Sequence, residues 1–587
     1  MNYNLINENF REDYGENLLR ARGVTDIERF MNPDSFCLQD SSDLDNINEA
    51  VSLLHWAVEE AKVNIITITD CDTDGYCSCS MLYQYIKQIS PEARIDVLFH
   101  TGKQHGLSDK IDEILDSETN YGLCLIADAG SNDFEYIERL GENGIKTLII
   151  DHHILETKVS KYCVIVNNQA SREYKNKDLC GGGMVYQFLK YYDCKYGYYY
   201  ADNYLDLAAL AEIGDMMDMK ELENRYIVTK GLSNIRNKFF LDIIDRQAYS
   251  MNDKINPITV AFYIVPLINA MIRVGTQEEK ERLFWAFVDG RKMVPSHKRG
   301  AAGTEDFASL ESIRECTNAK ARQGRLLDQI TAQIDQKIIE NDLLQHKILF
   351  IELTDEDNFP SELNGLVAMR SSAKYKRPTI VARCNRQGEI KGSIRGLSNC
   401  ALTDFRGFLL DSGYFEWVMG HSNAAGCSIL DKNLEDFLEN SDETLKNMDF
   451  GEGIYDVNFV RYAAEPDIKD IIFDLGQYEN VWGQGNPEPM IYIKDLNIKK
   501  SDIKILGKTQ DTVKIEKYGV AYMKFHAKEL IEELNKYEEI KLNIVGKPNI
   551  NTWMGVQTAQ IFIEDYEVLD NTCLLYTSPS PRDRSVS

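Results

Sequence analysis

Short apolar runs alternate with helical stretches between about residues 50 and 240. The runs are rich in Val, Ile and Leu, which favour strands that are buried on both faces. They read VNIITIT before Asp70, LCLIA before Asp128, KTLII before Asp151 and YCVIV before Asn167. This alternation predicts a parallel sheet that is covered by helices.

A helical period follows between about residues 305 and 345, where Leu326, Ile330, Ile334 and Ile338 recur every four residues. It predicts a long amphipathic helix that connects two lobes. A second α/β pattern comes next, with predicted strands at KILFIEL, PTIVARC and GEIKGSIRG. Near the end of the chain, the short runs MIYIKD, TVKIEK and AQIFIEDY predict a small β-barrel.

These patterns divide the 587 residues into several domains, because one hydrophobic core usually serves roughly 100–200 residues. The last residues, LLYTSPSPRDRSVS, change abruptly to Ser, Pro and Arg, so we interpret 571–587 as a non-native tail. The predicted divisions are a lead-in at 1–48, an α/β lobe at 49–300, a connecting helix at 301–345, a smaller α/β lobe at 346–465 and a barrel at 466–570.

Composition narrows the class of protein. Hydrophobic residues make up 43% of the chain and charged residues 27%, which is typical of a folded globular protein. No apolar run approaches the ~18–20 residues that span a bilayer, and the start MNYNLINENFRED lacks the order of a signal peptide. We therefore expect a cytoplasmic protein without membrane contact. The 13 cysteines include no pair three residues apart, which argues against a zinc ribbon or a disulfide framework.

The net charge of −28 opposes binding to nucleic acid, because phosphate contacts normally supply much of that affinity. The net charge is a global sum, however. A groove that holds divalent cations and a few Lys and Arg side chains can still attract phosphate locally.

Acidic residues follow the first three predicted strands, at the sheet edge where open α/β proteins carry their active sites. The first strand leads into Asp70-Cys71-Asp72-Thr73-Asp74-Gly75, whose alternate carboxylates could converge on hard cations. A solvated turn is an equally good interpretation of this hexapeptide alone. An EF-hand is excluded, because Met81 stands where its loop requires Glu.

Three further positions strengthen the metal-site interpretation. Asp128 follows the second strand, and Asp151-His152-His153 follow the third. Only nine histidines occur in the chain, and two adjacent ones beside a carboxylate suit a metal ligand and a phosphate contact. Asp215 lies in the apolar stretch LAALAEIGDMMDM, where a carboxylate needs a partner such as a metal.

The order Asp-x-Asp-x-Asp-Gly, Asp, Asp-His-His, Asp resembles the four motifs of the DHH phosphoesterase superfamily, and further segments narrow the resemblance to RecJ. It covers about residues 15 to 570 and implies a DHH lobe, a connecting helix, a DHH-associated lobe and an oligonucleotide-binding (OB) barrel. The segments are Leu179–Gly183, Glu223–Arg225, Pro266 with Asn269, Ala270 and Arg273, Asn364–Ala368, and Gly483–Pro489.

This resemblance implies two divalent ions, Mn²⁺ or Mg²⁺. Asp72 would hold one ion and Asp74 the other, Asp128 would bridge them, and His152 and Asp215 would complete the second. Two ions that clamp the attacking and leaving oxygens suit phosphodiester hydrolysis. Asp70, Asp151 and His153 would orient ligands or phosphate.

The second lobe offers two glycine-rich segments, Gly392–Gly396 and Gly420–Gly426, that resemble the substrate-binding part of the family. Glycines allow backbone N–H groups to approach phosphate. Two residues depart from the family pattern: Met419 stands where glycine is usual, and Ile68 stands where some relatives offer a histidine ligand. The predicted substrate contacts are Arg273, Ser393, Arg395, Gly420, His421 and Asn423.

The resemblance implies a processive exonuclease that degrades single-stranded DNA from 5′ to 3′ and releases 5′-mononucleotides in DNA repair or recombination. It also implies a monomer that works with a single-strand-binding protein or a helicase. Two alternatives remain: a DHH phosphodiesterase that acts on short oligonucleotides or cyclic dinucleotides, and a non-catalytic DNA-binding replication factor. The C-terminal barrel argues against the first, and the intact carboxylates and paired histidines argue against the second.

Overall fold

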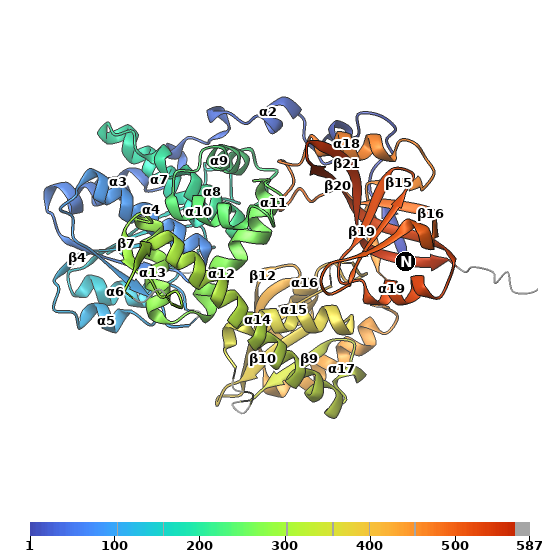
Figure 1. Ribbon diagram of the computed structural model, residues 1–587. Helices are drawn as coiled ribbons and strands as arrows, with labels where there is room; N and C mark the ends of the chain where they lie inside the picture. Colours follow the sequence, from blue (N-terminus) through green and yellow to red (C-terminus); the bar gives the residue numbers. More distant parts are fainter. Residues whose placement is uncertain are drawn as a thin grey trace, which may run out of the picture.

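The structure is a computed structural model that describes residues 1–569, apart from 103, 156–157, 301–302, 355–356, 358, 398 and 451–452. The predicted tail at 571–587 lies outside the described residues. Figure 1 shows three bodies, with a first α/β lobe on the left, a smaller α/β lobe below and a β-rich domain on the right.

The first lobe is built on five parallel strands in the order β3-β2-β4-β5-β6. Four of them are the predicted strands. The fifth, β3, lies at the sheet edge and is only partly buried, so it carries a weaker apolar signal. The bounds are β2 Asn64–Thr69, β3 Ile95–Phe99, β4 Tyr121–Ala127, β5 Lys146–Asp151 and β6 Cys163–Asn167.

Alternate residues of these strands enter two separate cores, because side chains alternate across a sheet. Ile65 and Leu125 join the large core beneath α4 and α7, whereas Ile66 and Ile126 join the smaller core beneath α5 and α6. The helices of this lobe are α3 Ile47–His55, α4 Thr73–Ile89, α5 Ile111–Leu115, α6 Phe134–Glu142, α7 Gly181–Tyr196, α8 Leu205–Gly214, α9 Leu222–Ser233, α10 Lys238–Gln247, α11 Pro257–Thr259, α12 Val265–Val274 and α13 Gln277–Val288. A hairpin of β7 (Met293–Pro295) and β8 (Glu305–Phe307) follows them.

The strand order positions the site. From β2 the chain runs to β3 at one edge of the sheet. It then returns past β2 to β4 and continues to β5 and β6, so the strand order reverses between β2 and β4. Ligand sites of open α/β sheets lie at such a switch point, beyond the carboxyl ends of the strands. Asp70 and Asp128 follow the two strands that meet there.

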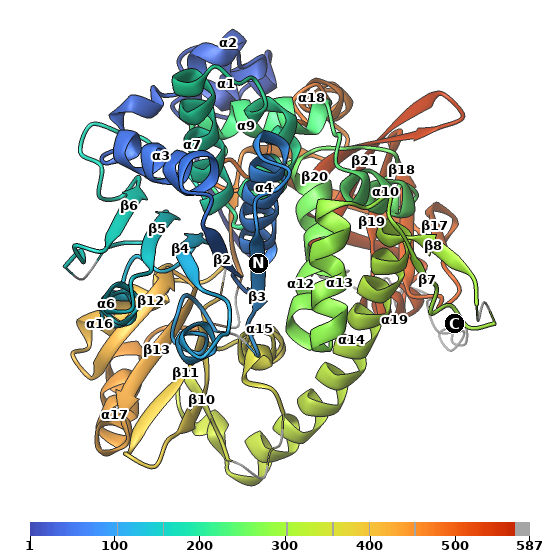
Figure 2. The same cartoon turned by 90° about the vertical axis from the view of Figure 1, so that its left-hand side faces the viewer.

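The predicted connecting helix is α14, which spans Ala308–Glu340 and runs from the first lobe to the second (Figure 2). Its packing partners change along its length. Cys316 and Ala319 belong to the core of the first lobe, whereas Leu327, Ile330, Ile334 and Ile338 pack in a core of the second. The four-residue repeat seen in the sequence therefore covers the part of α14 that packs on the second lobe.

The second lobe carries a mixed five-stranded sheet in the order β12-β13-β11-β10-β9, in which only β9 and β10 pair in parallel. The predicted strands KILFIEL, PTIVARC and GEIKGSIRG are β9, β10 and β11. The bounds are β9 Leu349–Leu353, α15 Asn364–Tyr375, β10 Thr379–Cys384, β11 Glu389–Arg395, α16 Phe405–Asp411, β12 Phe415–His421, β13 Ala424–Leu430 and α17 Leu434–Leu445.

The C-terminal domain contains a seven-stranded sheet in the order β15-β16-β20-β21-β19-β18-β17. Its longest strands, β20 and β21, form an antiparallel pair with a shift in register. The bounds are β14 Ile454–Val457, β15 Phe459–Tyr462, α18 Ile468–Gly476, β16 Ile491–Lys499, β17 Ile503–Leu506, β18 Thr512–Lys517, β19 Val520–Lys524, α19 Lys528–Asn535, β20 Glu539–Trp553 and β21 Val556–Leu569.

The start of the chain packs on this C-terminal domain. Strand β1 (Asn2–Leu5) pairs in parallel with β14, and α1 (Tyr14–Ala21) and α2 (Ile27–Met31) add Leu18, Leu19 and Phe30 to its core. The fully buried Arg461 ties the two segments together by donating to Asn9 and to the Phe10 carbonyl. The sequence patterns gave no sign of this contact.

One helical stretch among the described residues, Pro257–Val274, is long and apolar enough to cross a membrane by length and composition, and half of it is buried inside the protein. Its residues Val260, Ile264, Ile268 and Met271 lie in the large core of the first lobe. Packing within that core accounts for its hydropathy.

Candidate active site

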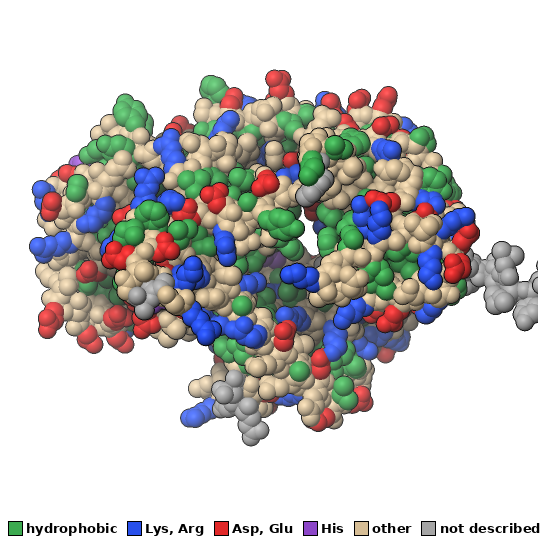
Figure 3. Space-filling view, in the orientation of Figure 1, with side chains coloured by type: hydrophobic (Ala, Val, Ile, Leu, Met, Phe, Trp, Pro, Cys, Tyr) green, Lys and Arg blue, Asp and Glu red, His purple; other side chains and the backbone are tan. Residues whose placement is uncertain are grey.

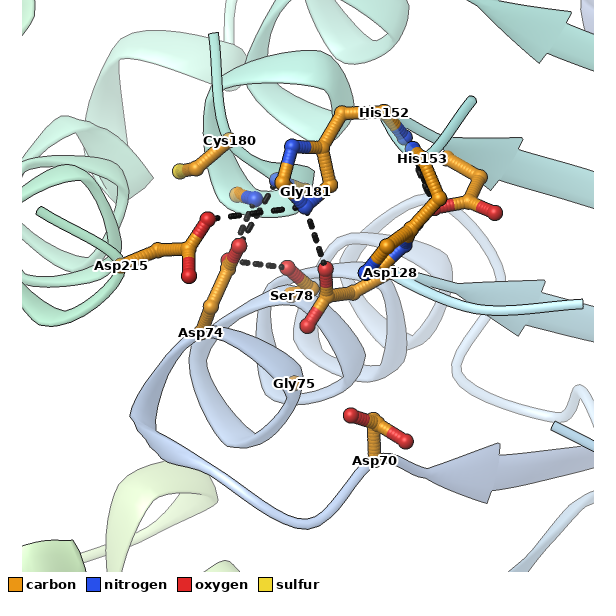
Figure 4. A network of polar contacts seen from close by, with 12 residues as sticks. Asp70, Asp74, Gly75, Ser78, Asp128, His152, His153, Cys180, Gly181 and Asp215 are labelled. Carbon is orange, nitrogen blue, oxygen red and sulfur yellow. Dashed lines mark hydrogen bonds and ion pairs between the residues drawn. The ribbon is translucent and has the colours of Figure 1, made fainter. Parts of the chain in front are cut away.

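The predicted acidic residues of the first lobe converge at the carboxyl edge of the parallel sheet, where Figure 4 shows their side chains facing one another. Asp70 follows β2, and Asp72 caps the N-terminus of α4 by accepting the Gly75 N–H at 3.0 Å. Gly75 has to be a glycine, because a Cβ there would lie 2.5 Å from the Cβ of Asp70. The hexapeptide thus folds as a tight strand-to-helix turn that exposes alternate carboxylates to one space.

Asp74 lies in the first turn of α4 and is buried. The backbone N–H groups of Gly181 and Gly182, at the N-terminus of α7, each donate to its carboxylate at 2.7 Å. Ser78 donates to the same carboxylate at 3.0 Å. These three donors fix the direction of the Asp74 oxygens, and glycine at 181 leaves room for Asp128, which a Cβ would approach to 2.5 Å.

Asp128 lies between the other groups. Its backbone has a φ of 64°, in the left-handed region, and its N–H donates to the Ile150 carbonyl of β5 at 2.9 Å. The Nε2 atom of His152 lies 3.2 Å from an Asp128 oxygen and 3.6 Å from an oxygen of Asp215, which follows α8. Strained backbone at such a position is common in active sites.

The ligand atoms form two adjacent groups. Asp70, Asp72 and Asp128 make one group, and Asp74, His152 and Asp215 make the other; within each group these atoms lie within 4.8 Å of one another. His152 contacts Asp128, so the two groups meet there. Carboxylate oxygens with one imidazole nitrogen form a donor set that suits Mn²⁺ or Mg²⁺.

The electrostatics of the site also fit bound cations. Burial raises the pKa of Asp128 well above its usual range, and the charges of Asp74 and Asp72 raise it further. Burial, together with Asp74 and Asp72, raises the pKa of Asp215 to about 8. Carboxylates this close repel one another unless protons or cations neutralise their charge. Bound divalent ions would remove this repulsion.

Asp151 and His153 form a pair whose ligand atoms also lie within 4.8 Å of those of Asp128 and His152. Asp151 accepts hydrogen bonds from the N–H groups of Ser131, His152 and His153, and from Nδ1 of His153 at 2.8 Å. Burial alone would raise the pKa of Asp151, but His153 and these donors lower it. Burial would lower the pKa of His153, but Asp151 raises it to about 9. Asp151 therefore remains ionised and fixes the backbone that carries His152.

The second lobe faces this site across the space between the two lobes, which we call the cleft. Figure 3 shows the surface hollowed between the bodies, with Lys and Arg side chains around the hollow. Arg395, at the end of β11, lies near enough to Arg273 of α12 for its pKa to be lowered by burial and by that charge. Arg273 in turn interacts with Asp72, so one predicted substrate contact lies beside the acidic groups and Arg395 lies near it.

Three of the other predicted substrate residues, Gly420, His421 and Asn423, lie at the β12–β13 turn, and the fourth, Ser393, lies on β11. His421 is exposed and interacts electrostatically with Asp178 of the first lobe, and Gly420 has a φ of 131°. Asn423 bonds within its own lobe, donating to the Thr403 carbonyl at 2.9 Å. Ser393 lies in the middle of the sheet opposite Gly426. His421 therefore faces the cleft, whereas Asn423 shapes the loop.

Known proteins resemble this chain over nearly its whole length. Residues 63–211 match the DHH family, N-terminal domain, and residues 467–565 match the RecJ OB domain. YorK of the SPbeta prophage in Bacillus subtilis, a protein named for single-strand DNA-specific exonuclease activity, is 36% identical over 577 residues, which cover 97% of this chain and 98% of YorK. The chain belongs to the RecJ-like family of DHH exonucleases.

More distant members of the family agree. The single-stranded-DNA-specific exonuclease RecJ of Haemophilus influenzae is 24% identical and covers 89% of this chain, which spans 91% of that protein. The crystal structure of Thermus thermophilus RecJ with Mn²⁺ superposes with a TM-score of 0.70 at 20% identity, over 94% of this chain and 75% of the other. That RecJ has also been crystallised with Mg²⁺. Mn²⁺ and Mg²⁺ are thus the ions that the donor set of this RecJ-like enzyme suits.

No role was predicted from the sequence for two residues that support the site of this RecJ-like chain. The Nδ1 atom of His105 lies 2.8 and 2.9 Å from the two oxygens of Asp70. Asn269 accepts from the Thr73 hydroxyl at 2.8 Å, which joins α12 to the acidic turn. Asn269 belongs to a segment that carries the family resemblance, and His105 lies in a loop with no periodic signal. Neither contact could be found by looking for polar residues near the acidic motif in the sequence. His105 is 35 residues from Asp70, and Asn269 is 196 residues from Thr73.

Proposed function

We propose that this exonuclease hydrolyses single-stranded DNA with two divalent ions, starting from the 5′ end and releasing 5′-mononucleotides. The observation that carries the proposal is the meeting of two ligand groups at Asp128. Full-length similarity to a protein named as a single-strand DNA-specific exonuclease supports the substrate. A role in DNA repair or recombination, the monomeric state, and a single-strand-binding protein or helicase as partner stay predictions from the family.

Asp72 and Asp128 would hold one ion, and Asp74, Asp128, His152 and Asp215 would hold the other. The position of Asp70 in the first group makes it a third candidate ligand. Two ions bound here would lower the pKa of an attacking water and neutralise charge on the attacking and leaving oxygens. The N–H groups of Gly181 and Gly182 hold the Asp74 carboxylate in its orientation within the second group.

The remaining residues act on the substrate phosphate. His153 carries a positive charge at neutral pH, since its pKa is about 9, and its side chain is half exposed toward the site. Arg273 lies beside the acidic groups and Arg395 lies near Arg273, while the imidazole of His421 lies near Asp178 of the first lobe. A phosphodiester would thus lie between carboxylates that hold the ions and cations that hold its free oxygens.

The proposal is tested with strands that carry a label at either end. We expect the purified chain with Mn²⁺ to release labelled mononucleotide from a 5′-labelled single strand at once and from a 3′-labelled one only late. Duplex DNA should resist, and a chelator should stop the reaction. Early release from the 3′ end would reverse the proposed polarity. Hydrolysis of dinucleotides but not of long strands would favour the short-oligonucleotide alternative.

A further inference from the structure

The loop between β3 and α5 is fastened to the two neighbouring loops that carry acidic residues of the site. The Cys71 thiol, in the acidic turn after β2, donates to the Gly102 carbonyl at 3.3 Å. Asp133, in the segment that joins β4 to α6, accepts the N–H of the fully buried Leu107 at 2.6 Å. The loop is therefore held on both sides of His105.

Between these two anchors, His105 reaches the carboxylate of Asp70. Its Nδ1 atom lies 2.9 Å from one oxygen of Asp70 and 2.8 Å from the other. Asp70 is only 2% exposed, whereas the side chain of His105 is half exposed. An ionised carboxylate can only accept hydrogen bonds, so Nδ1 carries the proton and donates to both oxygens. The imidazole thus limits the rotation of the buried carboxylate.

This contact decides which side of Asp70 can face an ion. A donor that is nearly equidistant from the two oxygens of a carboxylate lies where an ion chelated by both oxygens would lie. Asp70 belongs to the ligand group with Asp72 and Asp128, whose ligand atoms lie within 4.8 Å of one another. While His105 holds it, Asp70 can contribute only one oxygen to an ion in that group.

We propose that His105 is a positioning residue for the ion of Asp72 and Asp128, which we call the first ion. It orients Asp70 so that this carboxylate binds the first ion through a single oxygen. Hydrogen-bonding partners of this kind orient metal ligands in many proteins. The inference rests on the two-ion assignment of the proposed function, and it goes further by giving the β3–α5 loop a role in metal binding.

Calorimetric titration of the metal-free protein with Mn²⁺ tests the inference without any DNA. The parent should bind two ions. His105→Ala should weaken one of the two sites by roughly 10- to 100-fold, the usual cost of losing a partner that orients a metal ligand, and should leave the other site within about twofold. His526→Ala is the matched control, because His526 also pairs with a carboxylate, that of Asp511, but on the surface of the C-terminal domain. It should change neither site.

Two conservative variants separate an orienting N–H group from a side chain that only fills space. The amide nitrogen of asparagine can take the place of Nδ1, whereas that of glutamine takes the place of Nε2. His105→Asn should therefore restore most of the lost Mn²⁺ affinity, and His105→Gln should not. Equal affinity in the two variants would overturn the positioning role. Both keep a polar side chain, so the comparison holds even where the alanine variant fails to fold.

The dependence of hydrolysis on Mn²⁺ concentration gives a second readout. For His105→Ala, the Mn²⁺ concentration that gives half-maximal hydrolysis of a single strand should rise at least about tenfold. The rate at saturating Mn²⁺ should stay within about threefold of the parent, because the ion then binds despite the lost contact. A lower rate at saturation with an unchanged half-maximal concentration would place His105 in the chemical step and contradict the positioning role.

Failure of the inference and failure of the proposed function are distinguishable. Parental Mn²⁺ affinity at both sites of His105→Ala, in a chain whose parent degrades single strands, rejects the positioning role and leaves the proposed function intact. A parent that binds two ions but degrades no single strand rejects the proposed substrate, while a weakened site in His105→Ala still supports the positioning role. A parent that binds fewer than two ions rejects the two-ion assignment, and the inference with it.

Discussion

The two sides of the cleft hold their charges differently. On the first lobe, the buried Asp74 and Asp128 lie close to the partly buried Asp215, and burial together with the neighbouring carboxylates raises the pKa values of Asp128 and Asp215. Facing them, Arg395 of the second lobe and Lys320 of α14 lie near Arg273 of α12; burial lowers the pKa values of Arg395 and Lys320, and the charge of Arg273 lowers both further. Each side is unfavourable alone. Divalent cations would reduce the repulsion between the carboxylates of the first side, and phosphate would reduce the repulsion between the cations of the second.

This difference separates chemistry from binding. Changes on the acidic side should abolish turnover while the strand still binds, whereas changes on the basic side should weaken binding while bound strands are still cut. The predictions below test that separation, and they are ordered by the size of the expected effect.

Asp128→Ala should give the largest effect, because it removes the carboxylate at which the two ligand groups meet. We expect hydrolysis of a single strand to fall by at least about a thousandfold with Mn²⁺, since neither ion would keep its place. Affinity for the strand in chelator should change by less than about twofold, because the cations of the second side remain.

Asp116→Ala is the matched control for that experiment. Asp116 is an exposed acidic residue in the same lobe, and its loss should leave turnover unchanged. Near-parental digestion by pure Asp128→Ala would reject the two-ion assignment.

Gly181→Ala should disturb the same side without removing a ligand. The added Cβ would lie 2.5 Å from the Cβ of Asp128, so Asp128 or α7 has to move. A displacement of about 1 Å at a reacting centre lowers kcat by roughly a hundredfold. Single-turnover rates at saturating strand measure it. An unchanged rate would mean that the exact position of Asp128 does not matter.

Arg395→Ala tests the basic side. We expect affinity for a single strand to fall about five- to tenfold at fixed salt, with kcat at saturating strand reduced by less than about threefold. Arg386→Ala removes an exposed cation from the turn between β10 and β11 and serves as the control. A loss confined to kcat would place Arg395 in the chemical step and contradict the separation.

The smallest effect is a pH dependence of stability. The folded, metal-free chain raises the pKa of Asp215 from 3.8 to about 8, so the proton that this carboxylate holds stabilises the fold below pH 4 and that stabilisation is lost as the pH rises through 8. The thermal midpoint of the metal-free chain should therefore fall by a few degrees between pH 5.5 and 8.5. Mn²⁺ should raise the midpoint more at pH 8.5, because it replaces the proton. Asp215→Asn should flatten the profile, and a midpoint that rises with pH in the parent would contradict the assignment.

The sequence alone determined the layout of the acidic side. A parallel strand that ends in Asp is a local pattern, and parallel strands bring their carboxyl ends to one edge wherever they lie in the sheet. Asp70, Asp128 and Asp151 could therefore be placed together before the structure was known, and the α14 repeat fixed the connection between the lobes. Polarity of the strand, by contrast, rested on family resemblance throughout.

Tertiary structure alone decided the rest. The basic side is built from α12, α14 and β11, which carry Arg273, Lys320 and Arg395 and show no common sequence period. Asn423 belongs to a glycine-rich motif that predicted a substrate contact, but its side chain donates to a carbonyl of its own lobe. The first 31 residues pack on the C-terminal domain, through contacts that join positions more than 450 residues apart. Periodicity reports which face of an element is buried but not which distant element covers it, so these contacts become visible only when the lobes are assembled.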